Sequence, residues 1–292
     1  MVDLRLLKVI RPHIVAGGFL GYLAGALYGL SLGGGLSWYQ FLLGYMIVLF
    51  MDLSTHYNND YYDVEVDRNA PFKPFGSVNL LIDDNEMRGS AFKVAVACSV
   101  FSLLMATASF FTGSTWHLID VVVLFNVLGW LYSAPPVRLH SRRLGEVTIA
   151  VGTGFCVPAV GYIIARNGID GGFALFSVPL ILYGFILSLS LQVPDFEVDR
   201  LMDKKTIVGL IGRRRTYLVV FMCAVAASAI YFLLLPALHP VMAPWASLIP
   251  TASSLVSVLT LSDTLEHARQ YTWLNISTLF LFLTSLDLML LL

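Results

Sequence analysis

The sequence predicts an all-α polytopic membrane protein, a bundle of about nine transmembrane helices. Of its 292 residues, 57% are hydrophobic and 13% are charged, and the mean hydropathy is +0.77. Soluble domains carry about a quarter charged residues. Charged residues are also clustered, and none lies between Pro12 and Met51. Because a helix crosses a bilayer with about 20 residues, and because the apolar runs are continuous, helices are favoured over the alternating strands of a barrel.

Breaks in the apolar runs separate the expected helices. The glycine-rich segment 31–37 divides the first run, 112–117 ends the third helix, and the prolines of 236–240 end the seventh. Clusters of charged residues mark the other boundaries. The nine helices are expected at 13–31, 38–60, 91–111, 117–134, 147–165, 174–197, 215–235, 241–261 and 271–291. Together they form a single domain over residues 1–292.

The basic residues favour one orientation in the membrane. All but one of the 18 Lys and Arg residues precede the first helix or follow an even-numbered one, and Arg166 is the exception. By the positive-inside rule, the N-terminus is cytoplasmic and the C-terminus outside, and the plasma membrane is the expected location. The net charge of −1 makes a nucleic-acid partner unexpected. Cys98, Cys156 and Cys223 stand alone in apolar runs and predict neither a disulfide nor a zinc site.

An acidic ladder lies at the cytoplasmic end of the second helix. Asn59, Asp63 and Asp67 are spaced by four residues, so they share one helix face. Asp52 and His56 lie on the same face, deeper in the membrane. Ionisable residues inside a membrane face a cavity or a partner, so this face is a candidate functional surface.

The end of the sixth helix repeats this ladder with Asp195, Asp199 and Asp203, and Gln192 lies on the same stripe. The hexapeptides that begin at Asp63 and Asp195 agree at five of six positions. Carboxylates four residues apart repel one another, so two facing ladders favour bound cations. Mg²⁺ accepts one or two carboxylates with water and phosphate oxygens. The alternative is that both ladders are solvated helix ends.

Cationic loops accompany the ladders. Beside carboxylate-bound Mg²⁺, Lys and Arg side chains could hold a diphosphate and stabilise its departure. The alternative for each one is a role in topology or contact with anionic lipid, which is also the role expected of Arg213, Arg214 and Arg215. The candidate diphosphate-binding residues are Lys73, Arg138, Arg142, Lys204 and Lys205.

Three motifs together resemble the UbiA superfamily of membrane prenyltransferases. These are Asn59-xxx-Asp63-xxx-Asp67, Asp195-xxx-Asp199, and the segment 132–139, which reads Tyr-Ser-Ala-Pro-Pro-Val-Arg-Leu. The resemblance implies transfer of an isoprenyl group from a diphosphate, such as geranylgeranyl diphosphate, to an acceptor in a cytoplasmic-side active-site cavity. It implies Mg²⁺ as the cofactor.

The resemblance also assigns roles to residues. Asp63, Asp67, Asp195 and Asp199 are the implied catalytic and metal-binding carboxylates, with Asn59 as a further ligand and Asp203 as an extension of the ladder. Lys204 or Lys205 would contact the diphosphate. The implied substrate pocket contains Tyr132 and Ser133. From their positions on the ladder faces, Gln192, Asp52 and His56 are further candidates for this pocket, although Asp52 and His56 could instead hydrogen-bond neighbouring helices. Arg11 could reach the cavity or could only set topology.

The segment after Asp67 bears on the acceptor. Its Pro-Phe and Gly-Ser pairs resemble the menaquinone-type branch, which prenylates a dihydroxynaphthoate. Ether-lipid and haem acceptors of the same superfamily are the alternatives. The charged loop 68–90 could form a lid over the diphosphate.

A cation-coupled transporter is the alternative from another class, because Pro194 interrupts the sixth helix. Transporter sites lie near the bilayer midplane, however, whereas both ladders lie at helix ends. The lipid bilayer is the expected environment, and no obligatory protein partner is indicated.

Overall fold

The computed structural model describes residues 5–6, 10–64, 68, 81–82, 84–202, 204–234 and 243–292. Within them the chain is helical, and an isolated bridge between Arg142 and Lys205 is its one β interaction. The helices are α1 (Pro12–Ser31), α2 (Trp38–Tyr62), α4 (Asn85–Phe111), α5 (His117–Ser133), η3 (Leu139–Ser141), α6 (Gly145–Val151), η4 (Gly152–Cys156), α7 (Val157–Arg166), α8 (Gly171–Gln192), α9 (Phe196–Leu201), α10 (Ile207–Ile211), α11 (Arg213–Leu234), α12 (Ala243–Ala246), α13 (Leu248–Leu259) and α14 (Leu265–Leu291).

The predicted membrane bundle is confirmed, although the number of nine spans stays a prediction. Among the described residues, six helices are long and apolar enough to cross a membrane, and one of them is the continuous rod of α6, η4 and α7. Helices α5 and α13 are shorter and apolar. Helix α2 has 25 residues, but its second half carries Asp52, His56 and Asn59, which lower its hydropathy.

Side-chain caps begin several of the long helices. Ser37 and Gln40 form a reciprocal capping box at the start of α2. Asp84 accepts a hydrogen bond from the Met87 N–H of α4, and Asp170 accepts one from the Phe173 N–H of α8. Such caps satisfy N–H groups that have no partner within the helix.

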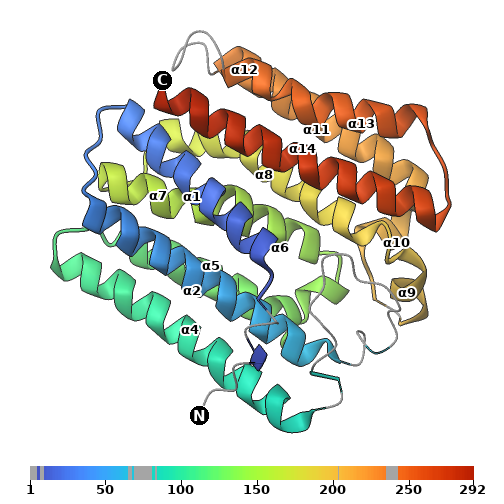
Figure 1. Ribbon diagram of the computed structural model, residues 1–292, viewed down its shortest axis with the longest axis horizontal. Coiled ribbons are helices and arrows are strands. Elements are labelled where there is room, and N and C mark those ends of the chain that lie inside the picture. Colours follow the sequence, from blue (N-terminus) through green and yellow to red (C-terminus); the bar gives the residue numbers. More distant parts are fainter. Residues whose placement is uncertain are drawn as a thin grey trace.

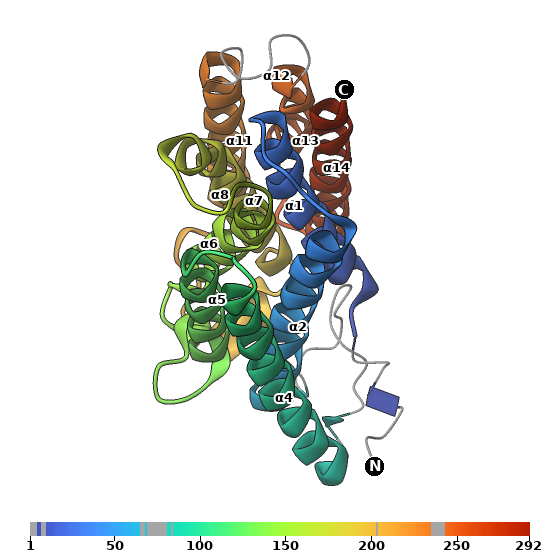
Figure 2. The ribbon, with the colours of Figure 1, turned by 90° about the vertical axis from the view of Figure 1, so that its left-hand side faces the viewer.

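The helices lie side by side along a common direction (Figure 1). Helix α2 packs on α4 and α5 at one side, and α8 packs on α11 and α6 at the other. Helix α1 packs against α7 and α14, as the end-on view shows (Figure 2). A side-chain carbon at Gly25 of α1 would overlap the backbone of Pro158 in α7. Glycine therefore permits this close approach of two backbones, as is usual between membrane helices.

The end of α2 and the short helices α9 and α10 lie at the same end of the bundle (Figure 1). We call this the ladder end, because the described residues of both acidic ladders lie there.

Candidate active site

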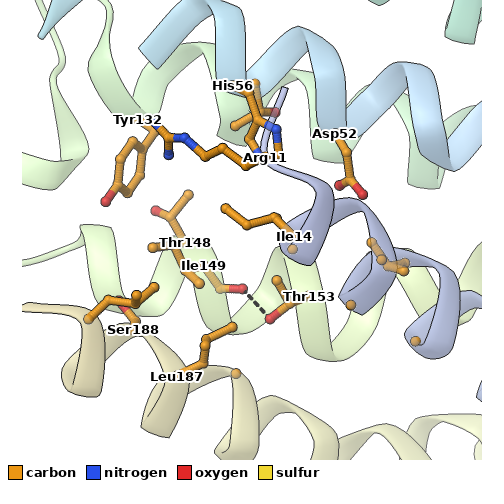
Figure 3. Close-up of a pocket in the computed structure, with 18 of the residues that line it drawn as sticks. Arg11, Ile14, Asp52, His56, Tyr132, Thr148, Ile149, Thr153, Leu187 and Ser188 are labelled. Carbon is orange, nitrogen blue, oxygen red and sulfur yellow. Dashed lines mark hydrogen bonds between the residues drawn. The ribbon is translucent and has the colours of Figure 1, made fainter. Parts of the chain in front are cut away.

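A cavity of about 390 Å³ lies within the bundle, lined by α1, α2, α5, α6, η4, α7, α8, α9 and α14 (Figure 3). Both ladders contribute to it. The predicted site residues that line it are Asp52, His56, Asn59, Asp63, Tyr132, Gln192, Asp195, Asp199 and Lys204. Residues more than 100 positions apart in the sequence are therefore brought around one space.

Asn59 and Asp63 represent the first ladder in the cavity. Asp63 follows the last turn of α2 and is buried, and its Oδ1 lies 3.5 Å from Nε2 of His140. Asn59 Oδ1 accepts a hydrogen bond from the Ser133 hydroxyl. Ser133, expected to line the pocket, is fully buried behind it and holds Asn59 instead. Asp67 lies outside the described residues.

Asp195 and Asp199 represent the second ladder. Helix α8 ends at Gln192, and α9 begins after Asp195, so the two ladder residues follow a turn rather than a continuous helix. Asp199 is buried, and its Oδ1 lies 3.5 Å from Nζ of Lys204. Burial opposes the charge of Lys204, but Asp199, Tyr132, Asp63 and Asp195 raise its pKa above the ordinary value. Lys204 therefore stays cationic, and Asp203 lies outside the described residues.

His140 joins the site although the sequence analysis did not single it out. It is buried, and burial together with Lys204 and Arg138 lowers its pKa to about 3. The ring is therefore neutral at pH 7 and contacts Asp63 without adding positive charge. Its position directly after the motif 132–139 was the available signal.

The segment 139–146, from η3 to the start of α6, contacts both ladder regions. Besides His140 beside Asp63, the Arg143 N–H donates to the Lys205 carbonyl at 2.8 Å. The fully buried Glu146 accepts a hydrogen bond from the Ile207 N–H at 2.6 Å. These contacts fix the segment that carries Lys204 against the end of the first ladder.

The other predicted diphosphate-binding residues do not line the cavity. Arg138, Arg142 and Lys205 are exposed on loops at the ladder end, and Arg142 donates to the Pro136 carbonyl at 2.9 Å. Lys73 lies outside the described residues, as does most of the predicted lid 68–90.

Arg213 has a structural role that the expectation of a surface charge missed. It is 5% exposed. Its guanidinium donates to the Val193 and Asp263 carbonyls and to Glu197, at 2.9–3.0 Å. These hydrogen bonds therefore hold the turn that contains Asp195 against the starts of α11 and α14.

Apolar side chains form the rest of the wall. Those from α1, α8 and α14 include Ile14, Leu187, Leu191, Ile276, Leu279, Phe280 and Leu283, and α5, α6 and α7 contribute others. Thr148 and Thr153 also line the cavity (Figure 3). No sequence pattern marked these two threonines, because their position depends on how α6 and η4 pack.

The donor atoms at the ladder end suit a hard cation. Asp63, Asp195, Asp199 and Asn59 supply carboxylate and amide oxygens, and the Gln192 Oε1 is buried without a hydrogen-bond partner in the described part of the chain. No three acidic, His or Cys side chains there are close enough to hold a metal alone. This arrangement fits Mg²⁺, which binds through one or two carboxylates together with substrate phosphates.

Fold and site thus define a polytopic helical membrane protein whose cavity joins two carboxylate ladders to an apolar interior. The chain belongs to the UbiA prenyltransferase family, whose model matches residues 19–286. It is accordingly an enzyme of the prenyltransferase class.

Two relatives illustrate the range of the family. The 1,4-dihydroxy-2-naphthoate octaprenyltransferase of Bacillus subtilis (strain 168) is 20% identical over 207 residues, which are 71% of this chain and 66% of that protein. The chain thus spans slightly less than two thirds of this relative's length. A digeranylgeranylglyceryl phosphate synthase of Methanosphaera stadtmanae is 26% identical over 241 residues, 80% of this chain and 77% of that protein.

Solved structures share the fold. A UbiA homologue from Archaeoglobus fulgidus, bound to DMAPP and Mg²⁺, superposes with a TM-score of 0.69 at 18% identity, covering 95% of this chain and 98% of that one. A UbiA homologue from Aeropyrum pernix K1 in its apo state gives 0.73 at 14% identity, covering 94% and 97%.

Proposed function

We propose that this protein transfers an isoprenyl group from a polyprenyl diphosphate to an aromatic quinone precursor within the membrane, with Mg²⁺ as cofactor. One observation carries the proposal: Asp63, Asp199 and Lys204 meet at one end of a cavity whose remaining wall is mainly apolar. A diphosphate needs the charged end, and an isoprenoid chain needs the apolar wall.

The ladders would hold the cation. Asn59 and Asp63 would bind it on one side and Asp195 and Asp199 on the other, with Asp67 and Asp203 as expected further ligands. Bound Mg²⁺ would neutralise the diphosphate and stabilise the negative charge that grows on it as it leaves. Of the lining side chains, Lys204 adds a fixed cation beside Asp199. Lys73, Arg138, Arg142 and Lys205 would reach the diphosphate from their loops.

The reaction breaks the bond between C1 of the isoprenyl group and the diphosphate oxygen, and the electron pair leaves with the diphosphate. The acceptor forms a bond to C1 and loses a proton. The apolar side chains of α8 and α14 would keep water from the developing allylic cation. Tyr132, at the ladder end of the cavity, would contact the reacting end of the substrate.

An ether-lipid acceptor is the second candidate. It is favoured by three relatives named digeranylgeranylglyceryl phosphate synthase, each at 24–26% identity. The aromatic acceptor is favoured by the Bacillus relative and by the residues after Asp67. A cation transporter is disfavoured by family membership and by ladders that lie at one end of the bundle.

The proposal is tested with purified protein, geranylgeranyl diphosphate and a panel of acceptors, by measuring diphosphate release and prenylated lipid. We expect product with Mg²⁺ and none with EDTA. Removing one ladder carboxylate in Asp63→Asn or Asp199→Asn should lower kcat at least about 100-fold, the order expected for loss of a group that stabilises charge in the transition state.

The matched control is Asp263→Asn, since Asp263 is an exposed carboxylate outside the cavity. It should retain wild-type rates. Full activity of both ladder variants, or activity in EDTA, would contradict the proposal.

A further inference from the structure

The residues that precede α1 pack against α2 and α4 at the ladder end (Figure 1). Leu6 is 2% exposed and belongs to an apolar cluster, which we call the Leu6 socket. The other buried members of the socket are Tyr57, Val64, Leu81, Met87, Ala91 and Ala95. Ile10 packs against the same socket, and Arg11 lines the cavity. We call Arg5, Leu6, Ile10 and Arg11 the N-terminal strap.

Two side-chain hydrogen bonds attach the strap to α2. The Tyr57 hydroxyl donates to the Leu6 carbonyl at 2.9 Å, in a buried position. Arg11 Nη2 donates to Asp60, whose carboxylate is buried on α2. Leu6 and Arg11 are five residues apart, so the strap contacts the same helix at two separate points.

The face of α2 that the strap contacts lies next to the first ladder. Tyr57 and Asp60 are three residues apart, so they share one face of the helix. Asn59 and Asp63 lie about 100° round the helix from that face. The contacts of the strap therefore oppose a rotation of α2 that would turn the ladder away from the cavity. Residues outside the cavity can in this way set the position of the ladder oxygens.

The free energy that holds the strap in place is small. Chain termini are ordered only where specific contacts hold them. The ion pair between Arg5 and Asp84, 3.3 Å long, is exposed and contributes little. The buried Leu6 side chain and its hydrogen bond with Tyr57 contribute more. A short terminal segment of this kind can undock while the helical bundle stays folded.

We propose that docking of the N-terminal strap positions the first ladder and thereby strengthens the binding of prenyl diphosphate with Mg²⁺. This inference rests on the proposed function. Leu6 and Tyr57 are positioning residues, because they act on Asn59 and Asp63 through α2 and do not line the cavity. By thermodynamic linkage, a ligand that binds better to the docked state also stabilises docking by the same factor. A strap with only a structural role would show no such coupling.

The first test measures affinity without turnover. Isothermal titration with geranylgeranyl diphosphate and Mg²⁺, in the absence of an acceptor, gives the Kd of each variant. Leu6→Ala empties the socket and should raise this Kd at least about 10-fold. Leu6→Met refills the socket and should recover most of the affinity. The matched control is Leu118→Ala, because Leu118 is buried at the opposite end of the bundle and outside the cavity lining. It should lower thermal stability and leave the Kd unchanged.

A smaller change removes one hydrogen bond of the strap. Tyr57→Phe keeps the ring in the socket but leaves the Leu6 carbonyl without its donor, so the Kd should rise about 3- to 10-fold. Tyr22→Phe is the matched control, since it removes a bond of the same kind, from the Tyr22 hydroxyl to the Phe41 carbonyl at 2.8 Å. Tyr22 does not line the cavity, so this variant should bind as wild type.

The second test measures the coupling from the side of the strap. Trypsin cleavage between Arg5 and Leu6 requires an undocked strap, so its rate reports the undocked population. In wild-type protein, saturating geranylgeranyl diphosphate with Mg²⁺ should slow this cleavage by about the factor by which Leu6→Ala raises the Kd. In Leu6→Ala the same ligands should give little protection. Mass spectrometry of the intact chain measures the extent of cleavage.

An unchanged Kd in both Leu6→Ala and Tyr57→Phe would overturn the inference. So would equal rates of trypsin cleavage with and without ligands, in wild-type protein that binds prenyl diphosphate. If folded wild-type protein does not bind prenyl diphosphate at all, the proposed function fails first and the inference falls with it.

Discussion

The side chains of the two ladders are held by residues from other parts of the chain. Ser133 of α5 donates to Asn59, His140 lies 3.5 Å from Asp63, and Lys204 lies 3.5 Å from Asp199. Each partner limits the rotamers of the residue it contacts. Groups that orient metal ligands in this way change affinity even though they never touch the ion.

The Ser133 hydroxyl offers a direct test at the residue scale. Ser133→Ala removes the hydrogen bond to Asn59, so the amide is no longer held toward the cavity. We expect the Mg²⁺ concentration for half-maximal prenylation to rise about 10-fold, with little change in saturating kcat. Ser285→Ala, which removes an exposed hydroxyl bonded within its own helix, is the matched control. An unchanged Mg²⁺ requirement in Ser133→Ala would show that Asn59 needs no such support.

At the scale of elements, the segment 139–146, from η3 to the start of α6, links the two ladders. Asp63 directly follows α2 and Lys204 lies in the turn after α9, so two segments distant in the sequence must be held together. The segment 139–146 does this through His140, the Arg143 backbone and the Glu146 carboxylate. Glu146 is the strongest anchor, because it is fully buried and accepts from the first N–H of α10.

Replacing Glu146 therefore tests the role of this segment. Glu146→Ala leaves the Ile207 N–H without a partner and should lower stability by about 1–3 kcal/mol, while raising the KM for prenyl diphosphate as Lys204 shifts. Glu146→Gln retains an acceptor oxygen and should recover most of both losses. Thermal unfolding in detergent and steady-state kinetics measure the two effects. Equal behaviour of the Ala and Gln variants would rule out an anchoring hydrogen bond.

At the scale of the whole molecule, charge is concentrated at the ladder end. The opposite end carries Arg166, which donates to the Leu32 carbonyl at 2.7 Å. From the positive-inside rule we expect the ladder end, with the cavity's charged residues, to face the cytoplasm. A water-soluble diphosphate would reach the carboxylates from that side.

Single cysteines report this orientation in intact cells. Glu266→Cys lies at the ladder end, and Gly171→Cys lies at the opposite end, where nothing surrounds the glycine. An impermeant thiol reagent should modify Gly171→Cys from outside and reach Glu266→Cys only after permeabilisation. The native cysteines are buried or partly buried and set the background. The reverse pattern would place the ladders outside.

Much of the architecture follows from local features of the sequence. The uncharged run from Pro12 to Met51 and the glycines of 31–37 predicted the hairpin of α1 and α2. The matching hexapeptides at Asp63 and Asp195 pointed to paired acidic elements, and Asp63, Asp195 and Asp199 line one cavity. The sixth expected helix, 174–197, instead ends at Gln192, because the chain turns at Pro194 before α9 begins.

By itself, the sequence determined the all-α membrane fold, the family and the composition of the ladders, because hydropathy and helical spacing are properties of neighbouring residues. Only the tertiary structure decided that Ser133 supports Asn59, that Arg213 is buried beneath the second ladder, and that His140 contacts Asp63. It also decided that Arg11 and Asp52 line the same cavity. These relations depend on how helices distant in the sequence pack together, and no local pattern encodes that packing.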